Sequence, residues 1–164
     1  MARGDVEFVE FVKVSTSRLH HAAYLLTGDR HQAEDDVQAV LVKVYAAWSR
    51  IRRRDAFAYA RTVLANLVVD RWRRPLREDA TEELPERAAP GDLADEVAVQ
   101  EWLMRALARL SPRERTIVVL RHFWDLSEAD VAAELKVSVG TVKSTASRAL
   151  TKMRVSTQDV ERVS

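Results

Sequence analysis

Cysteine is absent from the 164-residue chain, which excludes disulfides, thiolate metal sites and cysteine nucleophiles. Glycine and proline occur only four times each, so few positions force a helix or strand to stop. No apolar run approaches the length of a membrane span, and the N-terminus has no signal-peptide pattern. We therefore expect a cytoplasmic protein without membrane contact. Of the residues that are present, 47% are hydrophobic and Ala, Leu, Val, Arg and Glu dominate, which favours packed helices.

Charge is nearly balanced overall, at +1, but it is segregated along the chain. Nine arginines and two acids lie between residues 50 and 77, whereas acids dominate from residue 78 to 101. From residue 135 to 158 there are five cations and no acid. Two basic blocks thus flank an acidic one, and this pattern predicts two surfaces that face polyanions.

The first 75 residues contain three stretches with helical spacing of apolar residues. Gly28 is expected to end the first helix, Asp29 to cap the second and Pro75 to end the third. The second helix begins with acids, which suit the positive end of its dipole. Its apolar side is predicted to consist of Ala33, Val37, Val40, Leu41, Val44, Tyr45 and Trp48. The pattern predicts a three-helix bundle.

Residues 76–95 contain prolines, a glycine and several acids with little periodicity, which is typical of a flexible linker. Helical spacing returns after it. Ser111, followed by Pro112 and Glu114, predicts a helix that continues through Phe123, and Ser127 predicts the start of the next. A tight turn over residues 136–138 then leads into a final helix.

Two short helices joined by such a turn form a helix-turn-helix pattern. Ser138 is expected to cap the final helix, whose core side would carry Val142, Ala146, Ala149, Leu150 and Met153. Its outward side would carry hydroxyls and cations, namely Thr141, Lys143, Ser144, Ser147, Arg148 and Lys152. Such a surface suits a DNA major groove, because small residues allow close approach and long cations reach bases and phosphates. The alternative is a solvated helix on an ordinary bundle.

Four segments share the pattern of one known family. They are residues 33–38 (AEDDVQ), residues 65–74 with their Ala-Asn-Leu, Asp-Arg and Arg-Arg steps, residues 110–115 (LSPRER) and residues 138–150. In this order they resemble the extracytoplasmic-function (ECF) RNA polymerase sigma factors, in particular the small actinobacterial SigE-like type. The resemblance covers nearly the whole chain.

The resemblance implies an all-α protein of two small helical domains. These are a three-helix sigma-2 bundle over residues 1–75 and a sigma-4 helix-turn-helix domain over residues 96–156, joined by the flexible linker 76–95. Such a protein binds RNA polymerase core and directs promoter-specific transcription initiation through minus-10 and minus-35 elements. Core polymerase and promoter DNA are the implied partners and an anti-sigma factor is a candidate third. We expect a monomer in the free state, no cofactor and no catalytic residues.

The resemblance also implies roles for single residues. Those similar to the polymerase-docking segment are Asp35, Val37, Gln38 and Leu41. Minus-10 DNA would be held by the basic loop 50–54, including Arg54, and by a helix face bearing Arg61, Asn66, Asp70 and Arg73. Minus-35 DNA would meet the outward side of the final helix defined above. The linker is either a solvated tether or a mimic of phosphates through Glu78, Asp79, Glu82, Glu83 and Glu86.

Tyr59 and Trp72 could stack on bases, but aromatics at helical spacing more often lie in a core. Four residues depart from the family pattern. Asp36 stands where an apolar residue is usual, Ala39 where a glutamate is usual, and Thr145 and Ala146 where many relatives have an arginine and a larger aliphatic. The first two bear on polymerase docking and the last two on the minus-35 sequence.

A regulator and an enzyme are the two alternatives to this interpretation. A stand-alone helix-turn-helix regulator with a helical sensor or dimerisation domain would share the C-terminal motif, and it would bind paired half-sites as a dimer. An enzyme would need convergent polar residues, yet there is no glycine-rich phosphate loop and no metal-ligand spacing. The adjacent His20 and His21 point in different directions on a helix, so no metal site is expected.

Overall fold

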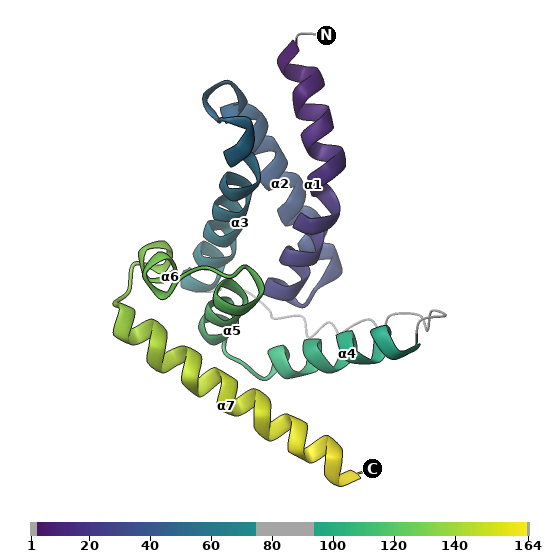
Figure 1. Ribbon diagram of the computed structural model, residues 1–164, viewed down its shortest axis with the longest axis vertical. Helices are drawn as coiled ribbons and strands as arrows, with labels where there is room; N and C mark the ends of the chain where they lie inside the picture. Colours follow the sequence, from purple (N-terminus) through teal and green to yellow (C-terminus); the bar gives the residue numbers. More distant parts are fainter. Residues whose placement is uncertain (1–2, 75–93, 164) are drawn as a thin grey trace. The chain divides into compact units, whose positions relative to one another are not determined.

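The computed structural model describes residues 3–74 and 94–163. This described part consists of seven α-helices with short 3-10 and π turns and holds no β-strand, so the predicted all-α class is confirmed (Figure 1). The chain divides into two compact units, residues 1–71 and 72–164. The helix stop at Pro75 and most of the predicted linker, with its five candidate phosphate mimics, lie outside the described residues.

The N-terminal unit contains α1 (Arg3–Thr27), α2 (Arg30–Ala47) and α3 (Ala56–Arg73), whose last two residues fall beyond the unit's boundary. The predicted corner between α1 and α2 is confirmed. Gly28 has φ 70, a left-handed conformation that glycine adopts without steric cost, and it ends α1. Asp29 then caps α2, because its side chain accepts a 3.0 Å hydrogen bond from the backbone nitrogen of Gln32. Two 3-10 turns, Trp48–Arg50 and Arg53–Asp55, connect α2 to α3.

The core of this unit is formed by apolar residues from all three helices. Its largest fully buried side chains are Leu19 and Leu25 of α1, Val37, Val40 and Val44 of α2, and Leu64 of α3. Each contributes about 1.5–3 kcal/mol relative to an exposed position. Tyr45 was predicted to lie on the apolar side of α2, but it is 54% exposed. Its ring packs against Phe8, with centroids 4.8 Å apart, and its hydroxyl donates to Asp5, so the aromatic ring lies at the edge of the core.

The C-terminal unit contains α4 (Ala94–Ala108), α5 (Pro112–Val118), α6 (Glu128–Leu135) and α7 (Val139–Val163). The predicted start at Ser111 is confirmed as a capping box: Ser111 accepts from the backbone nitrogen of Glu114, and the Glu114 carboxylate accepts from that of Ser111. The helix does not continue in α form to Phe123 as predicted. Val119–Phe123 is a π turn, in which the backbone nitrogen of Trp124 donates to the carbonyl of Val119.

Helices α6 and α7 enclose the predicted turn at residues 136–138. Lys136 adopts a left-handed conformation, φ 55, which stops α6 and reverses the chain. On α7 the core side is shifted from the prediction. Thr145 is buried together with Val142 and Ala149, whereas Ala146, Leu150 and Met153 are half-buried. Three neighbouring positions on one helical stripe, 142, 145 and 149, therefore set which way α7 faces.

Candidate nucleic-acid interfaces and docking surface

The start of α7 is organised by Ser138, as predicted. Its hydroxyl accepts a 3.1 Å hydrogen bond from the backbone nitrogen of Thr141 and shares a 2.8 Å contact with the Thr141 hydroxyl. Beyond this turn Lys143, Ser144, Ser147 and Arg148 are exposed, while Thr141 is half-buried. The predicted outward side of the helix is thus present, and two small hydroxyl residues occupy its middle.

The cations of this side are held by neighbouring groups. Lys143 and Arg148 are five residues apart, about 140° around the helix axis, so they flank the two serines. Lys143 lies 3.7 Å from the Glu128 carboxylate of α6, and the Arg148 guanidinium donates to the Thr145 hydroxyl at 3.3 Å. The Lys143 ion pair is at the surface, where such a pair contributes little, and Arg148 is itself exposed, so both cations can be redirected to phosphate or base edges.

Lys152 differs from them. Its ammonium donates a 2.8 Å hydrogen bond to the Glu114 carboxylate on α5. Burial by itself would raise the pKa of Glu114, but hydrogen bonds from Lys152 and from the Ser111 backbone and hydroxyl hold that pKa below its ordinary value. The sequence placed Lys152 among the DNA-binding residues, whereas the structure directs its charge toward a carboxylate inside the C-terminal unit.

A second exposed stripe runs along α3. Tyr59, Asn66, Asp70 and Arg73 recur at intervals of three to seven residues and are all exposed, which places them on one face of the helix. Tyr59 was predicted more often to be core, but it is 38% exposed on this stripe. The seven-residue spacing between Tyr59 and Asn66 is about two helical turns, and it could have indicated from the sequence that both residues lie on one face.

Arg61 does not belong to this stripe, although the sequence grouped it there. Five residues separate it from Asn66, so the two point about 140° apart. The Arg61 guanidinium lies 5.6 Å from the centroid of the Phe57 ring, and the Arg18 guanidinium of α1 lies 4.0 Å from the same ring. Burial, and then the nearby charge of Arg18, lower the pKa of Arg61.

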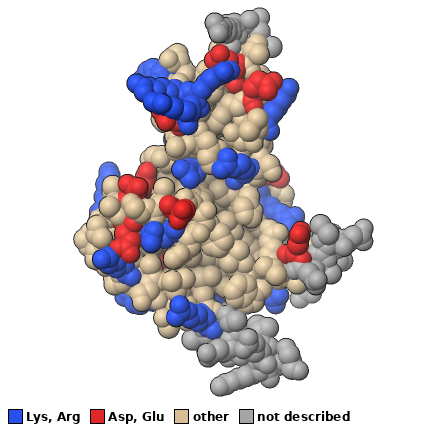
Figure 2. Space-filling view, viewed as in Figure 1, with Lys and Arg blue, Asp and Glu red and all other residues tan. Residues whose placement is uncertain are grey.

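A basic patch covers the connection between α2 and α3, and Figure 2 shows its Lys and Arg side chains gathered at the upper left of the view. It is formed by exposed arginines in and between the two 3-10 turns, namely Arg50, Arg52, Arg53 and Arg54. Arg53 forms a 3.3 Å ion pair with Glu7 of α1. Four arginines within five residues concentrate positive charge, which favours contact with a phosphate backbone.

The candidate docking face lies on α2. Asp35 and Gln38 are exposed and Leu41 is half-buried, so these three are accessible to a partner. Val37 is only 1% exposed and belongs to the core, where a partner cannot reach its side chain. The resemblance includes Val37 because residues 33–38 match the docking segment of the family. On the helix, however, Val37 lies on the same side as the buried Ala33 and Val40.

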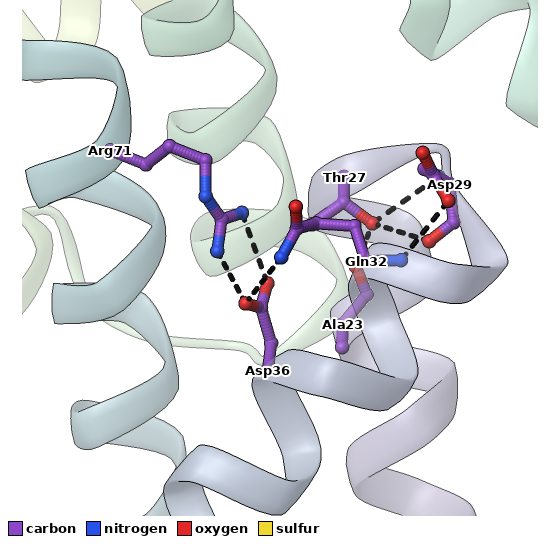
Figure 3. Close-up of polar contacts among 6 residues, drawn as sticks. All are labelled: Ala23, Thr27, Asp29, Gln32, Asp36 and Arg71. Atoms are coloured by element: carbon purple, nitrogen blue, oxygen red, sulfur yellow. Dashed lines mark hydrogen bonds and ion pairs between the residues drawn. The ribbon is translucent and has the colours of Figure 1, made fainter. Parts of the chain in front are cut away.

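Asp36 was noted in the sequence only as a departure from a family pattern, and the structure gives it a partner. Asp36 is 3% exposed and forms a bidentate ion pair with Arg71 of α3 (Figure 3). In one of the two contacts, Nη1 of Arg71 lies 3.1 Å from Oδ2 of Asp36. The side-chain amide of Gln32 donates to the same carboxylate at 3.0 Å. The charge on Asp36 is therefore satisfied within the N-terminal unit.

The described residues contain no group of three or more His, Cys, Asp or Glu that could hold a metal ion. In that same part of the chain, no helix is long and apolar enough to cross a membrane.

Comparison with known proteins gives matches in both halves of the chain. Residues 12–78 match the family described as Sigma-70 region 2, and residues 100–153 match Sigma-70, region 4. The RNA polymerase sigma-E factor of Streptomyces avermitilis is 41% identical over 157 residues, covering 94% of this chain and 87% of that protein. The ECF RNA polymerase sigma factor SigL of Mycobacterium tuberculosis is 31% identical, covering 85% and 86%.

A solved structure shares the fold. It is the sigma factor RpoE in complex with the anti-sigma factor NepR from Bartonella quintana, with a TM-score of 0.57 and 23% identity, covering 92% of this chain and 96% of that one.

Proposed function

The chain belongs to the ECF group of sigma-70 RNA polymerase sigma factors, and we propose that its exposed surfaces bind different partners. A sigma factor binds RNA polymerase core and directs it to promoter DNA, where transcription begins. Matches to sigma regions in both halves support this function over a stand-alone helix-turn-helix regulator. We propose that the chain acts by binding alone, without catalysis of its own, and in the cytoplasm, where its polymerase and DNA lie.

Docking on core polymerase is assigned to the exposed positions of α2. Asp35 and Gln38 provide a charge and an amide, and Leu41 provides partly exposed apolar surface. A small charged surface with an apolar centre is typical of a protein–protein contact. Val37 then supports this face from the core and does not touch the polymerase.

Minus-10 DNA is assigned to the α3 stripe and the adjoining basic patch. Asn66 offers an amide for a base edge, and Tyr59 offers a ring on which an unstacked base can lie. Arg73 and Arg54 are exposed and suit phosphates, while Asp70 can accept from a base amino group. Arg61 lies off the stripe, and we propose that it helps to pack α3 against α1, because its guanidinium and that of Arg18 on α1 lie over the same Phe57 ring.

Minus-35 DNA is assigned to α7. Thr141, Ser144 and Ser147 allow the helix to approach the major groove closely, with Lys143 on one flank and Arg148 on the other. We exclude Lys152 from this surface because of its contact with Glu114. Residues 1–75 and 96–156 would form separate domains joined by the acidic linker, and an anti-sigma factor is the third candidate partner, as in the complex with the same fold.

The observation that carries this assignment is the order of the two family regions, with an exposed hydroxyl-and-cation face on the last helix of the second. Its test combines the size of the free protein with capture of bacterial core polymerase and transcription from a cognate promoter. A monomer that binds core and supports initiation is expected. A dimer that binds paired half-sites without polymerase would overturn it.

A further inference from the structure

The contact between Asp36 and Arg71 joins two helices to which different functions are assigned. Asp36 follows Asp35 of the α2 docking face, and Arg71 follows Asp70 of the α3 stripe. Figure 3 shows the Arg71 side chain reaching from α3 to the carboxylate on α2, with the Gln32 amide beside it. The pair thus lies between the two surfaces and belongs to neither.

The geometry of the pair is restrictive. Both terminal nitrogens of Arg71 donate to Asp36, one to each carboxylate oxygen. A planar guanidinium that binds a carboxylate with two parallel hydrogen bonds tolerates little rotation or sliding. Gln32 restrains the carboxylate further, and its own backbone nitrogen is held by the Asp29 cap at the α1–α2 corner. The orientation of α3 about its axis is therefore tied to the start of α2.

Stability alone is a weak reason for this arrangement. Asp36 is buried, with only 4% of its side chain exposed, against 37% for Arg71. Removing a carboxylate from water costs free energy that an ion pair barely regains, and well-packed apolar residues of similar volume often serve as well or better. What an apolar pair does not provide is a defined rotation and register of one helix on the other.

We propose that Asp36 and Arg71 are positioning residues that set the minus-10 stripe of α3 relative to the polymerase-docking face of α2. With α2 fixed on the polymerase, the pair holds Tyr59, Asn66 and Asp70 where the DNA strand is opened. This inference rests on the proposed assignment of α2 to polymerase and α3 to DNA.

The decisive variant replaces the pair by apolar residues, Asp36→Leu with Arg71→Met. We expect thermal unfolding and affinity for core polymerase to stay at wild-type values, while opening of the minus-10 region by holoenzyme falls by about 2- to 30-fold. Opening is followed by fluorescence of 2-aminopurine in the minus-10 region. Wild-type opening by this variant would overturn the proposal, because the pair would then be structural only.

Two further measurements separate positioning from other roles. The slope of promoter binding against salt should be unchanged in the double variant, since Arg71 is engaged with Asp36; a slope lower by about one phosphate would make Arg71 a DNA contact and overturn the proposal. Should the double variant fail to fold, the near-isosteric Asp36→Asn keeps the shape and weakens the pair. It should show the same loss of opening with core affinity retained, and wild-type opening would again overturn the proposal.

Matched controls keep this test distinct from that of the proposed function. Gln32→Ala removes one contact to Asp36 but leaves the ion pair, so it should reduce promoter opening by less than the apolar double variant does. Asn66→Ala tests the stripe itself. If Asn66→Ala opens the promoter as wild type does, the minus-10 assignment fails. If Asn66→Ala lowers promoter opening while the double variant Asp36→Leu with Arg71→Met does not, only the positioning proposal fails.

Discussion

Lys152 of α7 and Glu114 of α5 are joined by a 2.8 Å hydrogen bond, and the same carboxylate oxygen of Glu114 accepts from the Ser111 backbone nitrogen at 2.9 Å. The Glu114 side chain thus completes the cap of α5 and holds α7 at Lys152. A lysine that the sequence places on the DNA-facing side is engaged within its own domain.

Replacing Lys152 by Ala should therefore lower stability and leave DNA contact largely intact. The Lys152 side chain is about half exposed, so solvent screening limits the loss of stability to about 1 kcal/mol or less. Thermal unfolding measures this loss, and the salt dependence of promoter binding provides the comparison. A salt slope lower by about one phosphate, at wild-type stability, would show that Lys152 contacts DNA.

The pKa of Glu114 lies below its ordinary value in the folded protein, and this gives a pH dependence with a definite sign. A carboxyl whose folded pKa is depressed stabilises the fold above its unfolded pKa, about 4.3, and loses that contribution as the pH falls through the lower folded pKa. The stability difference between wild type and Glu114→Gln should be largest above about pH 5 and shrink on acidification. Urea unfolding from pH 3 to 7 measures it. A difference that is constant over this range would contradict the coupling.

Arg148 and Lys143 should play different roles at the minus-35 element. We expect the Arg148 guanidinium to bind a guanine with two hydrogen bonds. Arg148→Ala should then cost about 1–3 kcal/mol of promoter binding by holoenzyme, and the loss should depend on the identity of that one base pair. Lys143→Ala should lower affinity evenly across sequences and reduce the salt slope by about one phosphate. Binding of promoter variants at several salt concentrations distinguishes them. If neither substitution changes minus-35-dependent binding, this face of α7 is not the recognition surface.

Charge reversal on α2 should weaken the complex with core polymerase. Asp35→Lys with Gln38→Ala alters two exposed side chains outside the core, so helicity should be retained while core affinity falls by about tenfold or more. Circular dichroism and a titration of labelled protein with core polymerase measure the two quantities. Glu10→Lys on α1, also exposed, is the matched reversal and should bind normally. Equal affinity for both variants would remove α2 from the docking surface.

The two domains should separate by proteolysis of the free protein. The boundary is expected in the acidic, proline-containing stretch 76–95, because such segments expose backbone to proteases before packed helices do. Mass spectrometry of early fragments locates the cut. First cleavage within α1–α3 or α5–α7, with residues 76–95 intact, would place the boundary elsewhere.

Local features were predictable from the sequence by itself. The stop at Gly28, the caps at Asp29, Ser111, Ser127 and Ser138, and the turn before α7 all depend on residues within three or four positions of one another. Their hydrogen bonds follow from side-chain chemistry and helix geometry, whatever surrounds them. The all-α class and the order of the two sigma regions could be inferred for the same reason, since both rest on short segments.

The positions of side chains between helices were decided by tertiary structure alone. Helical spacing grouped Tyr45 with the core and Lys152 with the DNA-facing side, yet each is directed by a partner far away in the chain: Asp5 and Phe8 for Tyr45, and Glu114 for Lys152. Asp36 could be recognised in the sequence as unusual, but its partner Arg71 lies 35 residues away. Which residues become partners depends on how one helix is rotated against another, and this rotation cannot be predicted from the spacing of residues within a single helix.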